Sequence, residues 1–442
     1  ASWVSHRIWD LYEQYLTPKW AANPKMDALK EGIRELPDEE LWMAHELCRQ
    51  SLVRRARRLM QNNFRYMTDG AAPEVVTKRK SVLDPGILTI GFARRFATYK
   101  RGTLLLRNPD RLLALLKDTV RPVQFIFAGK AHPNDKPGQD LIKRIVEVAA
   151  MPQFVGKIIF LQNYDMELAR RMVQGVDVWL NTPTRPLEAS GTSGEKCVMN
   201  GVMQFSVLDG WWVEGYKEGA GWMLPMERTF TDQHFQDELD AEMIYNTIEE
   251  QIAPKYYARG TDNIPHEWVA SVKKCVADIA SNFTTNRMLI DYEERFYDKL
   301  AARKRKLSAD SCLLAREIAA WKRKVSAAWD QVRAVDVERV KIDKEAVCVG
   351  EKYRFSVTVD IANLRPEDIG VEMVIARQIV GGQGVNVVRT IRLERTRTDN
   401  NLVTYALDYT PDETGTFDVA LRIYPCNPHL PHRMDFALVK WA

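Results

Sequence analysis

Four cationic side chains lie close together in the segment 91–101, which reads GFARRFATYKR; they are Arg94, Arg95, Lys100 and Arg101. The apolar run 87–92 before them predicts a buried strand, and a helical pattern follows. Cations at the point where a parallel strand ends and a helix begins suit an anion such as phosphate. A solvated basic loop is the alternative interpretation, although the aromatic residues between the cations favour a buried loop.

A loop of small residues, 187–196 (LEASGTSGEK), stands between the apolar run 176–180 and a further helical pattern. Its two glycines allow backbone N–H groups to approach a ligand closely. Thr192 and Ser193 could cap the helix that carries Lys196, and Glu188 could accept hydrogen bonds from sugar hydroxyls. The spacing fits neither the P-loop nor the GxGxxG motif, so a tight turn with a helix cap remains an alternative.

Two further predicted strands, 123–128 and 157–161, also end in polar residues. Gly129 and Lys130 follow the first strand, and Asn163 and Tyr164 follow the second. Tyr164 alone is more often a packing residue than a ligand contact. Because the carboxyl ends of parallel strands meet at one edge of a sheet, we expect the four segments to converge on one site.

The elements that would position these residues form a doubly wound, Rossmann-like parallel sheet over 81–332, because short apolar runs alternate there with amphipathic helices. Besides the four runs named above, 203–208 is a fifth predicted strand. Residues 1–80 have a helical pattern. Within 333–442 the apolar period changes to two, and turn residues such as those at 381–382 separate about seven short strands, the last of them expected over 435–440. That pattern predicts an all-β sandwich of immunoglobulin-like size.

The composition excludes several classes of protein. The 442 residues carry a net charge of only +4, which predicts neither a nucleic-acid partner nor a membrane surface. Six cysteines without a CxxC pair are typical of a reducing, cytoplasmic compartment, and they predict no metal site. No apolar run reaches the roughly 18 residues that a membrane-spanning helix needs.

In their order and spacing, these segments resemble the glycogen and starch phosphorylase family, especially its shorter prokaryotic branch. The family's cofactor loop, EASGT followed by three residues and Lys, is matched without a gap by 188–196. Residues 200–201 and 208–210 downstream match as well, as do Tyr164 and the cationic segment upstream. The similarity covers about 3–329, and the β-rich region resembles a tail that occurs in the short branch.

The resemblance implies a GT-B fold, in which two Rossmann-like domains enclose the active site and this chain supplies the C-terminal one. The expected reaction is the reversible phosphorolysis of α-1,4-glucan ends by inorganic phosphate to glucose 1-phosphate, with retention of configuration. The phosphate of pyridoxal 5′-phosphate would act as the acid and base. Residues 1–80 would link from an N-terminal domain outside this chain, so we expect the chain to be inactive alone; a homo-oligomer is left open.

The resemblance also implies residue roles, carried over by position. Lys196 would bind pyridoxal 5′-phosphate as a Schiff base. The other cofactor contacts would be Thr192, Ser193, Arg94 and Tyr164. The catalytic phosphate-binding groups would be Arg95 and Lys100, and the glucosyl unit would contact Glu188, Ser190 and Gly191.

The sequence departs from the longer branch of the family at three places. Arg94 stands where that branch has Lys, Ala97 where it has His, and Gly194-Glu195 where it has Asn-Met. Arginine can still hold a phosphate, but it does so with a planar fork in place of a point charge. These differences agree with the short branch.

Two other functions stay open at this stage. A glycosyltransferase of the glycogen-synthase type, which uses a nucleotide sugar, would have similar cationic loops but would not need Lys196. A carbohydrate-binding fragment without activity is the other alternative, since the β-sandwich pattern by itself implies no chemistry.

Overall fold

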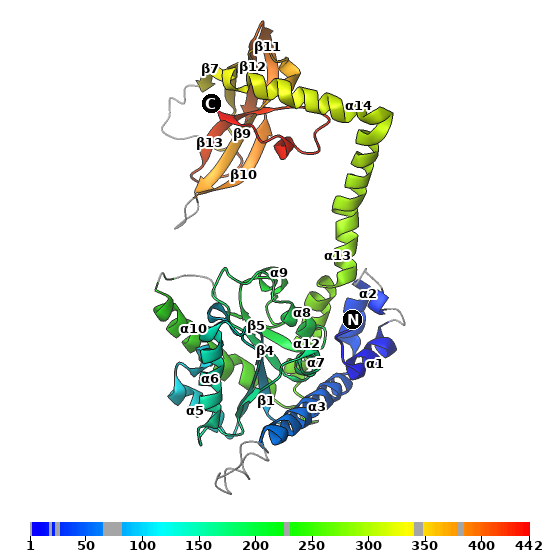
Figure 1. The fold of residues 1–442 in the computed structure, drawn as a ribbon, viewed down its shortest axis with the longest axis vertical. Coiled ribbons are helices and arrows are strands. Elements are labelled where there is room, and N and C mark those ends of the chain that lie inside the picture. Colours follow the sequence, from blue (N-terminus) through cyan, green and yellow to red (C-terminus); the bar gives the residue numbers. More distant parts are fainter. Residues whose placement is uncertain are drawn as a thin grey trace. The chain divides into compact units, whose positions relative to one another are not determined.

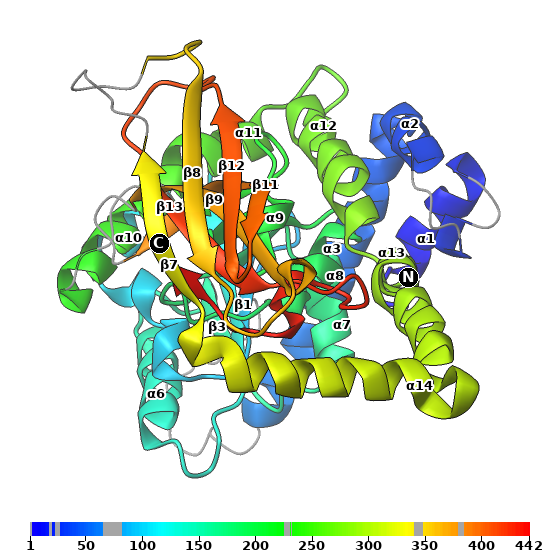
Figure 2. The same ribbon diagram turned by 90° about the horizontal axis from the view of Figure 1, so that it is seen from above.

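The computed structural model describes residues 2–16, 20–22, 27–64, 82–224, 230, 232–339, 348–378 and 384–442. They belong to two compact units, Ala1–Glu294 and Arg295–Ala442 (Figure 1, Figure 2). The boundaries predicted near 80 and 332 mark changes of sequence pattern and stay predictions. The two units meet in the sequence between Glu294 and Arg295. Trp321 and Val325, which precede residue 332, accordingly pack in the core of the second unit.

The first unit contains a six-stranded sheet in the order β3-β2-β1-β4-β5-β6, with every neighbouring pair parallel. Its strands are β1 (Leu88–Ala93), β2 (Val123–Ala128), β3 (Ile158–Leu161), β4 (Val178–Asn181), β5 (Met203–Val207) and β6 (Trp222–Leu224). This order reverses between β1 and β4, as in doubly wound folds, and it confirms the predicted Rossmann-like sheet. The three-residue β6 was not predicted, because it is too short to produce a recognisable apolar run.

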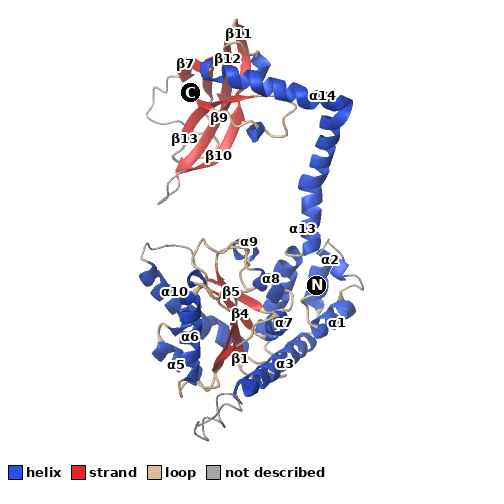
Figure 3. Cartoon of the chain, viewed as in Figure 1, coloured by secondary structure: helices blue, strands red, loops and turns tan. Residues whose placement is uncertain are grey.

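In Figure 3, blue helices surround the red strands of this sheet. They are α1 (His6–Tyr15), α2 (Asp27–Glu35), α3 (Asp38–Phe64), α5 (Pro109–Lys117), α6 (Lys136–Ala150), α7 (Met166–Gly175), α8 (Thr192–Val198), α9 (Trp212–Gly215), α10 (Gln233–Thr247), α11 (Ala253–Tyr257), α12 (His266–Lys274) and α13 (Thr285–Tyr292). The helical pattern predicted for 1–80 is confirmed at α1 to α3, whereas 65–80 lies outside the described residues.

The two faces of the sheet bury separate apolar cores, because neighbouring residues of a strand point to opposite sides. Phe125 and Phe127 face the core that α5, α6 and α10 cover. Ile126 and Ala128 face the other core, to which α3 and α7 contribute. Burial on both faces explains why the strands are continuous apolar runs in the sequence.

A buried ionic network joins α3 to the sheet at Asp177, which directly precedes β4. Arg49 donates a 2.6 Å hydrogen bond to its Oδ1, and His45 Nε2 lies 3.1 Å from the same oxygen. The backbone N–H of Thr89 donates to its Oδ2 at 2.8 Å. Burial alone would raise the pKa of Asp177, but the Arg49 charge and the His45 contact hold that pKa below its usual value. The carboxylate therefore stays ionised inside the unit.

The second unit begins with α14 (Asp298–Ala328), whose helical backbone is interrupted from Ala309 to Cys312. Two four-stranded antiparallel sheets follow, in the orders β10-β9-β13-β14 and β11-β12-β8-β7. Their strands are β7 (Arg333–Arg339), β8 (Tyr353–Asp360), β9 (Ile369–Gln378), β10 (Val385–Arg392), β11 (Glu394–Asp399), β12 (Leu402–Tyr409), β13 (Asp418–Pro425) and β14 (Lys440–Trp441). Residues of both sheets share one core, which confirms the predicted all-β sandwich.

The strand predictions failed at two places in this unit. The sequence of β11, ERTRTD, is exposed at every residue, so it has no apolar alternation that could reveal a strand. The strand expected over 435–440 is wrong, because a 3₁₀ turn ends at Asp435 and only Lys440 and Trp441 pair. The turn predicted at 381–382 lies outside the described residues.

Two further findings concern the cysteines and the helices. All six cysteines are unpaired. Among the described helices, none combines the length and the apolar character that crossing a membrane requires.

We predict that Asp177→Ala strongly destabilises the chain. The substitution leaves the Arg49 guanidinium buried without its carboxylate, which should cost about 3–5 kcal/mol in the free energy of unfolding. Because the folded pKa of Asp177 is depressed, its contribution should be present at neutral pH and should be lost as the pH falls below about 3.9, the usual carboxyl value. Guanidinium denaturation of the 442-residue chain measures both effects.

The matched control is Glu167→Ala. Glu167 pairs with Arg55, which also belongs to α3, but both side chains are substantially exposed, at 54% and 36%. Its removal should change the unfolding free energy by less than about 1 kcal/mol. Equal losses in the two variants would contradict a special role for Asp177.

Candidate active site

The loops after β1 and β4 meet at the carboxyl edge of the first unit's sheet. There the Glu188 carboxylate accepts hydrogen bonds from both Arg94 and Lys100. The three side chains are only 9%, 14% and 8% exposed, respectively. The predicted convergence of the cationic segment and the small-residue loop is thus present in the geometry, although 94 residues separate Arg94 from Glu188.

Electrostatics keep Glu188 ionised. Burial alone would raise the pKa of its carboxyl, but the hydrogen bond from Lys100 and the charge of Arg94 hold that pKa below its usual value. Two cations share one carboxylate, so the cluster retains an excess positive charge. A second anion can therefore enter beside Glu188 at a favourable Coulomb energy.

Arg94 still has capacity for such an anion. Its Nε and Nη1 atoms are buried, and neither has a hydrogen-bond partner among the described residues. Burial lowers the pKa of the Arg94 guanidinium, against the opposing charge of Glu188. Buried donors without partners are uncommon in folded proteins, so a ligand with acceptor oxygens would fit here.

Tyr164 lies near the same arginine. Burial raises the pKa of its phenol to about 12, and the Arg94 charge acts on it in the opposite direction. The hydroxyl is therefore neutral at physiological pH and can donate a hydrogen bond. The preceding residue, Asn163, has a φ of 56°, a left-handed conformation that turns the chain sharply after β3.

Helix α8 begins differently from the prediction. Its N-cap is Gly191, with a φ of 87°, and no side chain caps it. Thr192 and Ser193 are the first two helical residues, so the predicted capping by their hydroxyls is wrong. Glycine adopts the left-handed conformation without steric cost, which makes a side-chain cap unnecessary. The backbone N–H groups of Thr192 and Ser193 have no partner in the described part of the chain, as is usual for the first turn of a helix.

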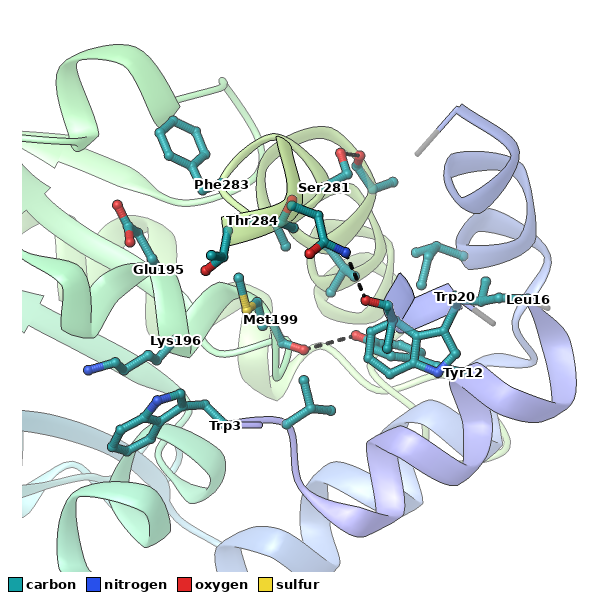
Figure 4. A pocket seen from close by; sticks show the side chains of 18 of the residues that line it. Trp3, Tyr12, Leu16, Trp20, Glu195, Lys196, Met199, Ser281, Phe283 and Thr284 are labelled. Atoms are coloured by element: carbon teal, nitrogen blue, oxygen red, sulfur yellow. Dashed lines mark hydrogen bonds between the residues drawn. The ribbon is translucent and has the colours of Figure 1, made fainter. Parts of the chain in front are cut away.

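Lys196, on α8, lies against the indole ring of Trp3, with its Nζ 4.2 Å from the ring centroid (Figure 4). Both residues line a cavity of about 360 Å³, together with Glu195, Met199 and others. Tyr12 closes part of its wall, because its hydroxyl donates to the Met199 carbonyl at 3.2 Å. A lysine amine beside an aromatic face and an open cavity can accommodate a planar aromatic ligand.

Trp3 was not predicted as a site residue, because a single tryptophan in a short segment has no spacing signal. Asn200 brings it into place. The Asn200 side chain donates to the Trp3 carbonyl at 3.0 Å and to the Lys196 carbonyl at 2.8 Å, and it accepts from the Ser5 amide at 2.8 Å. One side chain therefore ties the N-terminal segment to the helix that carries Lys196.

Among the described hydrogen bonds and ion pairs, the remaining candidates make none with the Glu188 carboxylate. Arg95 is exposed, and no described carboxylate pairs with it. Arg101 is buried, but its guanidinium is bound by Asp237 and Asp240 of α10, so the expectation that it forms part of an anion site is wrong. The Ser190 carbonyl accepts from the Trp211 amide at 2.9 Å, which holds the loop that also contains Gly191.

Asp209 contacts the backbone of Glu188, although no role was predicted for it from the sequence. Its Oδ2 accepts a 2.9 Å hydrogen bond from the Glu188 amide. The sequence shows it only as part of the matching residues 208–210, and nothing in the spacing reveals which backbone group it contacts. Within the described residues, no group of three or more His, Cys, Asp or Glu side chains could hold a metal ion.

Comparison with known proteins identifies matching families and relatives. A family described as carbohydrate phosphorylase matches residues 57–223, and one described as glycogen phosphorylase C-terminal domain matches 329–442. Maltodextrin phosphorylase of Thermococcus litoralis is 37% identical over 445 residues, which cover 100% of this chain and 51% of the relative.

Two glycogen phosphorylases are also similar. The protein of Aquifex aeolicus is 42% identical over 299 residues, covering 68% of this chain and 42% of its own length. The protein of Mycobacterium tuberculosis is 34% identical over 440 residues, covering 96% of this chain and 50% of its own. The chain thus spans about half the length of the curated relatives it matches.

We predict that Lys100→Met raises the pKa of the Glu188 carboxyl, because the nearest ammonium group is removed while Arg94 remains. Titration of the Glu188 side-chain carbon by NMR measures the change. Lys130→Met is the control, since Lys130 is an exposed lysine after β2 with no ion pair in the described part of the chain. An unchanged Glu188 titration in Lys100→Met would show that the pair does not form in solution.

Proposed function

Since the chain belongs to the carbohydrate phosphorylase family, we propose that the complete protein is an α-1,4-glucan phosphorylase. Its parallel sheet is the C-terminal half of the family's GT-B fold. The reaction would transfer the terminal glucosyl unit of a glucan to inorganic phosphate, with retention, to form glucose 1-phosphate. The observation that carries this proposal is the buried Glu188 carboxylate shared by Arg94 and Lys100 at the same sheet edge as the small-residue loop of Lys196.

The residues around Lys196 fit pyridoxal 5′-phosphate as the cofactor. The amine of Lys196 would bind it covalently, and Trp3 offers an aromatic face beside that amine. The unpartnered N–H groups of Arg94 suit a dianionic phosphate, as do the backbone amides of Thr192 and Ser193. When bound, the cofactor supplies a phosphate group that can exchange a proton with the substrate phosphate.

The substrates would occupy the space next to these groups. Lys100 and the exposed Arg95 would bind inorganic phosphate and let two phosphates lie close together despite their repulsion. The carboxylate of Glu188 would accept hydrogen bonds from sugar hydroxyls, with Ser190 and Gly191 completing the contact. Positive side chains held in place before the reaction stabilise the charge that develops as the glycosidic bond breaks, which is the contribution we assign to Lys100 and Arg95.

A second domain would complete the cleft. The chain covers 51% of its maltodextrin phosphorylase relative, and we propose that an N-terminal half supplies the opposite wall, so this chain alone is inactive. Its six unpaired cysteines support a reducing, cytoplasmic location. The matching families are both phosphorylase families, which disfavours the nucleotide-sugar alternative.

We predict that the complete protein, supplied with pyridoxal 5′-phosphate, develops a near-ultraviolet or violet absorption band. Borohydride reduction should fix the label on the peptide that contains Lys196. Lys196→Ala should abolish the fixed label, whereas Lys130→Ala should retain it. A label on another lysine, or no band after cofactor is added, would refute the assignment of Lys196.

The same protein should release glucose 1-phosphate from maltodextrin and inorganic phosphate. We expect Lys100→Ala to lower kcat by about 10²–10³-fold, because it removes one preorganised charge from the reacting phosphate. Lys143→Ala should leave kcat within twofold, because Lys143 is an exposed residue of α6 that pairs with Glu147. A folded, cofactor-loaded complete protein without phosphorolysis would contradict the proposed function.

A further inference from the structure

The loops after β1 and β4 are also joined by contacts to backbone atoms that do not involve the charged side chains of Glu188, Arg94 and Lys100. The Thr184 amide donates to the Tyr99 carbonyl at 2.7 Å. The Thr182 hydroxyl lies 3.3 Å from the Lys100 carbonyl. Residues 182–184, which lead to Glu188, therefore lie directly beside the backbone of Tyr99 and Lys100.

The side chain of Arg101 also connects the two loops. Its Nε donates to the Thr182 carbonyl at 2.8 Å, and its Nη2 donates to the Pro183 carbonyl at 3.1 Å. Its backbone φ of 51° is left-handed, which turns the chain after Lys100. The residue is only 7% exposed. A single planar guanidinium thus reaches from the loop after β1 to the loop after β4.

The other side of this guanidinium is bound to α10. Its Nη1 donates to Asp240 at 2.6 Å and to Asp237 at 3.0 Å. The Asp240 side chain is 3% exposed. Two carboxylates neutralise Arg101, so its charge is not available to a substrate anion. Its contacts instead connect three segments of the first unit.

Asp209 holds the Glu188 backbone through a separate contact. Its Oδ2 accepts from the Glu188 amide, and its Oδ1 accepts from the Gly210 amide, both at 2.9 Å. The residue follows β5 and is 8% exposed. The loop of Glu188 therefore has two buried supports: Arg101 after β1, which binds Thr182 and Pro183, and Asp209 after β5, which binds the Glu188 amide.

We propose that Arg101 and Asp209 are positioning residues, which fix the Glu188 carboxylate against Lys100 and Arg94 without touching substrate. The supporting geometry belongs to the chain itself; only the catalytic consequence rests on the proposed phosphorylase function. Small displacements of reacting groups are costly in enzymes, since a misplacement of about 1 Å can lower the rate by about 10²-fold.

The chemistry of the two side chains identifies informative substitutions. Arg101→Lys keeps the positive charge but loses the planar fork that reaches both backbone carbonyls and Asp240 at once. Asp209→Asn keeps the size, but its side chain presents one acceptor oxygen and one NH₂ donor, so one of the two amides loses its partner. Arg107→Lys is the matched control, because Arg107 also donates to Asp237, at 3.2 Å, but its side chain is 29% exposed and has no described hydrogen bond to the loop of Glu188.

The first measurement is the NMR titration of Glu188 in the 442-residue chain, recorded together with the thermal unfolding midpoint. In Arg101→Lys and Asp209→Asn we expect the Glu188 pKa to rise towards its ordinary value, because the carboxylate is no longer held against its two cations. In Arg107→Lys we expect no change in that titration. A purely structural role would lower the unfolding midpoint without moving the titration of Glu188.

A folded Arg101→Lys or Asp209→Asn variant whose Glu188 titrates as in the parent would overturn the proposal for that residue, as would an equal shift in Arg107→Lys. Should Arg101→Lys fail to fold, Asp240→Asn gives the same test, since it removes the carboxylate that orients Arg101. In the complete protein, Arg101→Lys should lower kcat by about 10²-fold. An inactive parent with the expected titration shifts would refute the phosphorylase function but leave the positioning roles standing.

Discussion

The shared carboxylate of Glu188 is the interaction on which the functional edge of this protein depends. It pairs with Arg94 and Lys100 in a largely buried setting, where charges are costly unless their partners are held in good geometry. The parallel sheet provides the first level of that geometry, because β1 and β4 are neighbours and Ile90 pairs with Val178. The carboxyl ends of both strands then open at the same place, and the remaining contacts set the alignment of the loops.

Glycine makes the close packing of these loops possible at two points. Gly129, after β2, has a φ of 152°, and a Cβ there would lie 2.0 Å from the Arg94 carbonyl oxygen. At Gly194 a Cβ would lie 1.6 Å from the Gln204 side-chain oxygen. Because no side chain intervenes at Gly194, α8 packs directly on β5. A larger residue at Gly129 would collide with the Arg94 backbone, and one at Gly194 would displace the Gln204 side chain.

Much of the fold could be predicted from the sequence. Strands buried on both faces are continuous apolar runs, so five of the six strands of the first sheet were predicted close to their observed bounds. The change to alternating residues revealed the β-sandwich. Strands without an apolar signal could not be predicted: β11 is wholly exposed, and β14 has two residues. The capping of α8 was mispredicted because glycine replaced a side-chain cap with a backbone conformation.

The sequence by itself determined which residue types stand at the strand ends, and hence that Arg94, Lys100, Glu188 and Lys196 would share one sheet edge. The tertiary structure alone decided how the charges divide between roles. In the sequence, Arg94, Lys100 and Arg101 are three cations of one segment with nothing to tell their roles apart. In the structure, Asp237 and Asp240, more than 130 residues away, bind Arg101, whereas Arg94 and Lys100 bind Glu188. Trp3 and Asp209 likewise gain their places from distant partners. The physical reason is that a charge's role depends on its nearest counter-charge, and folding, not spacing, selects that neighbour.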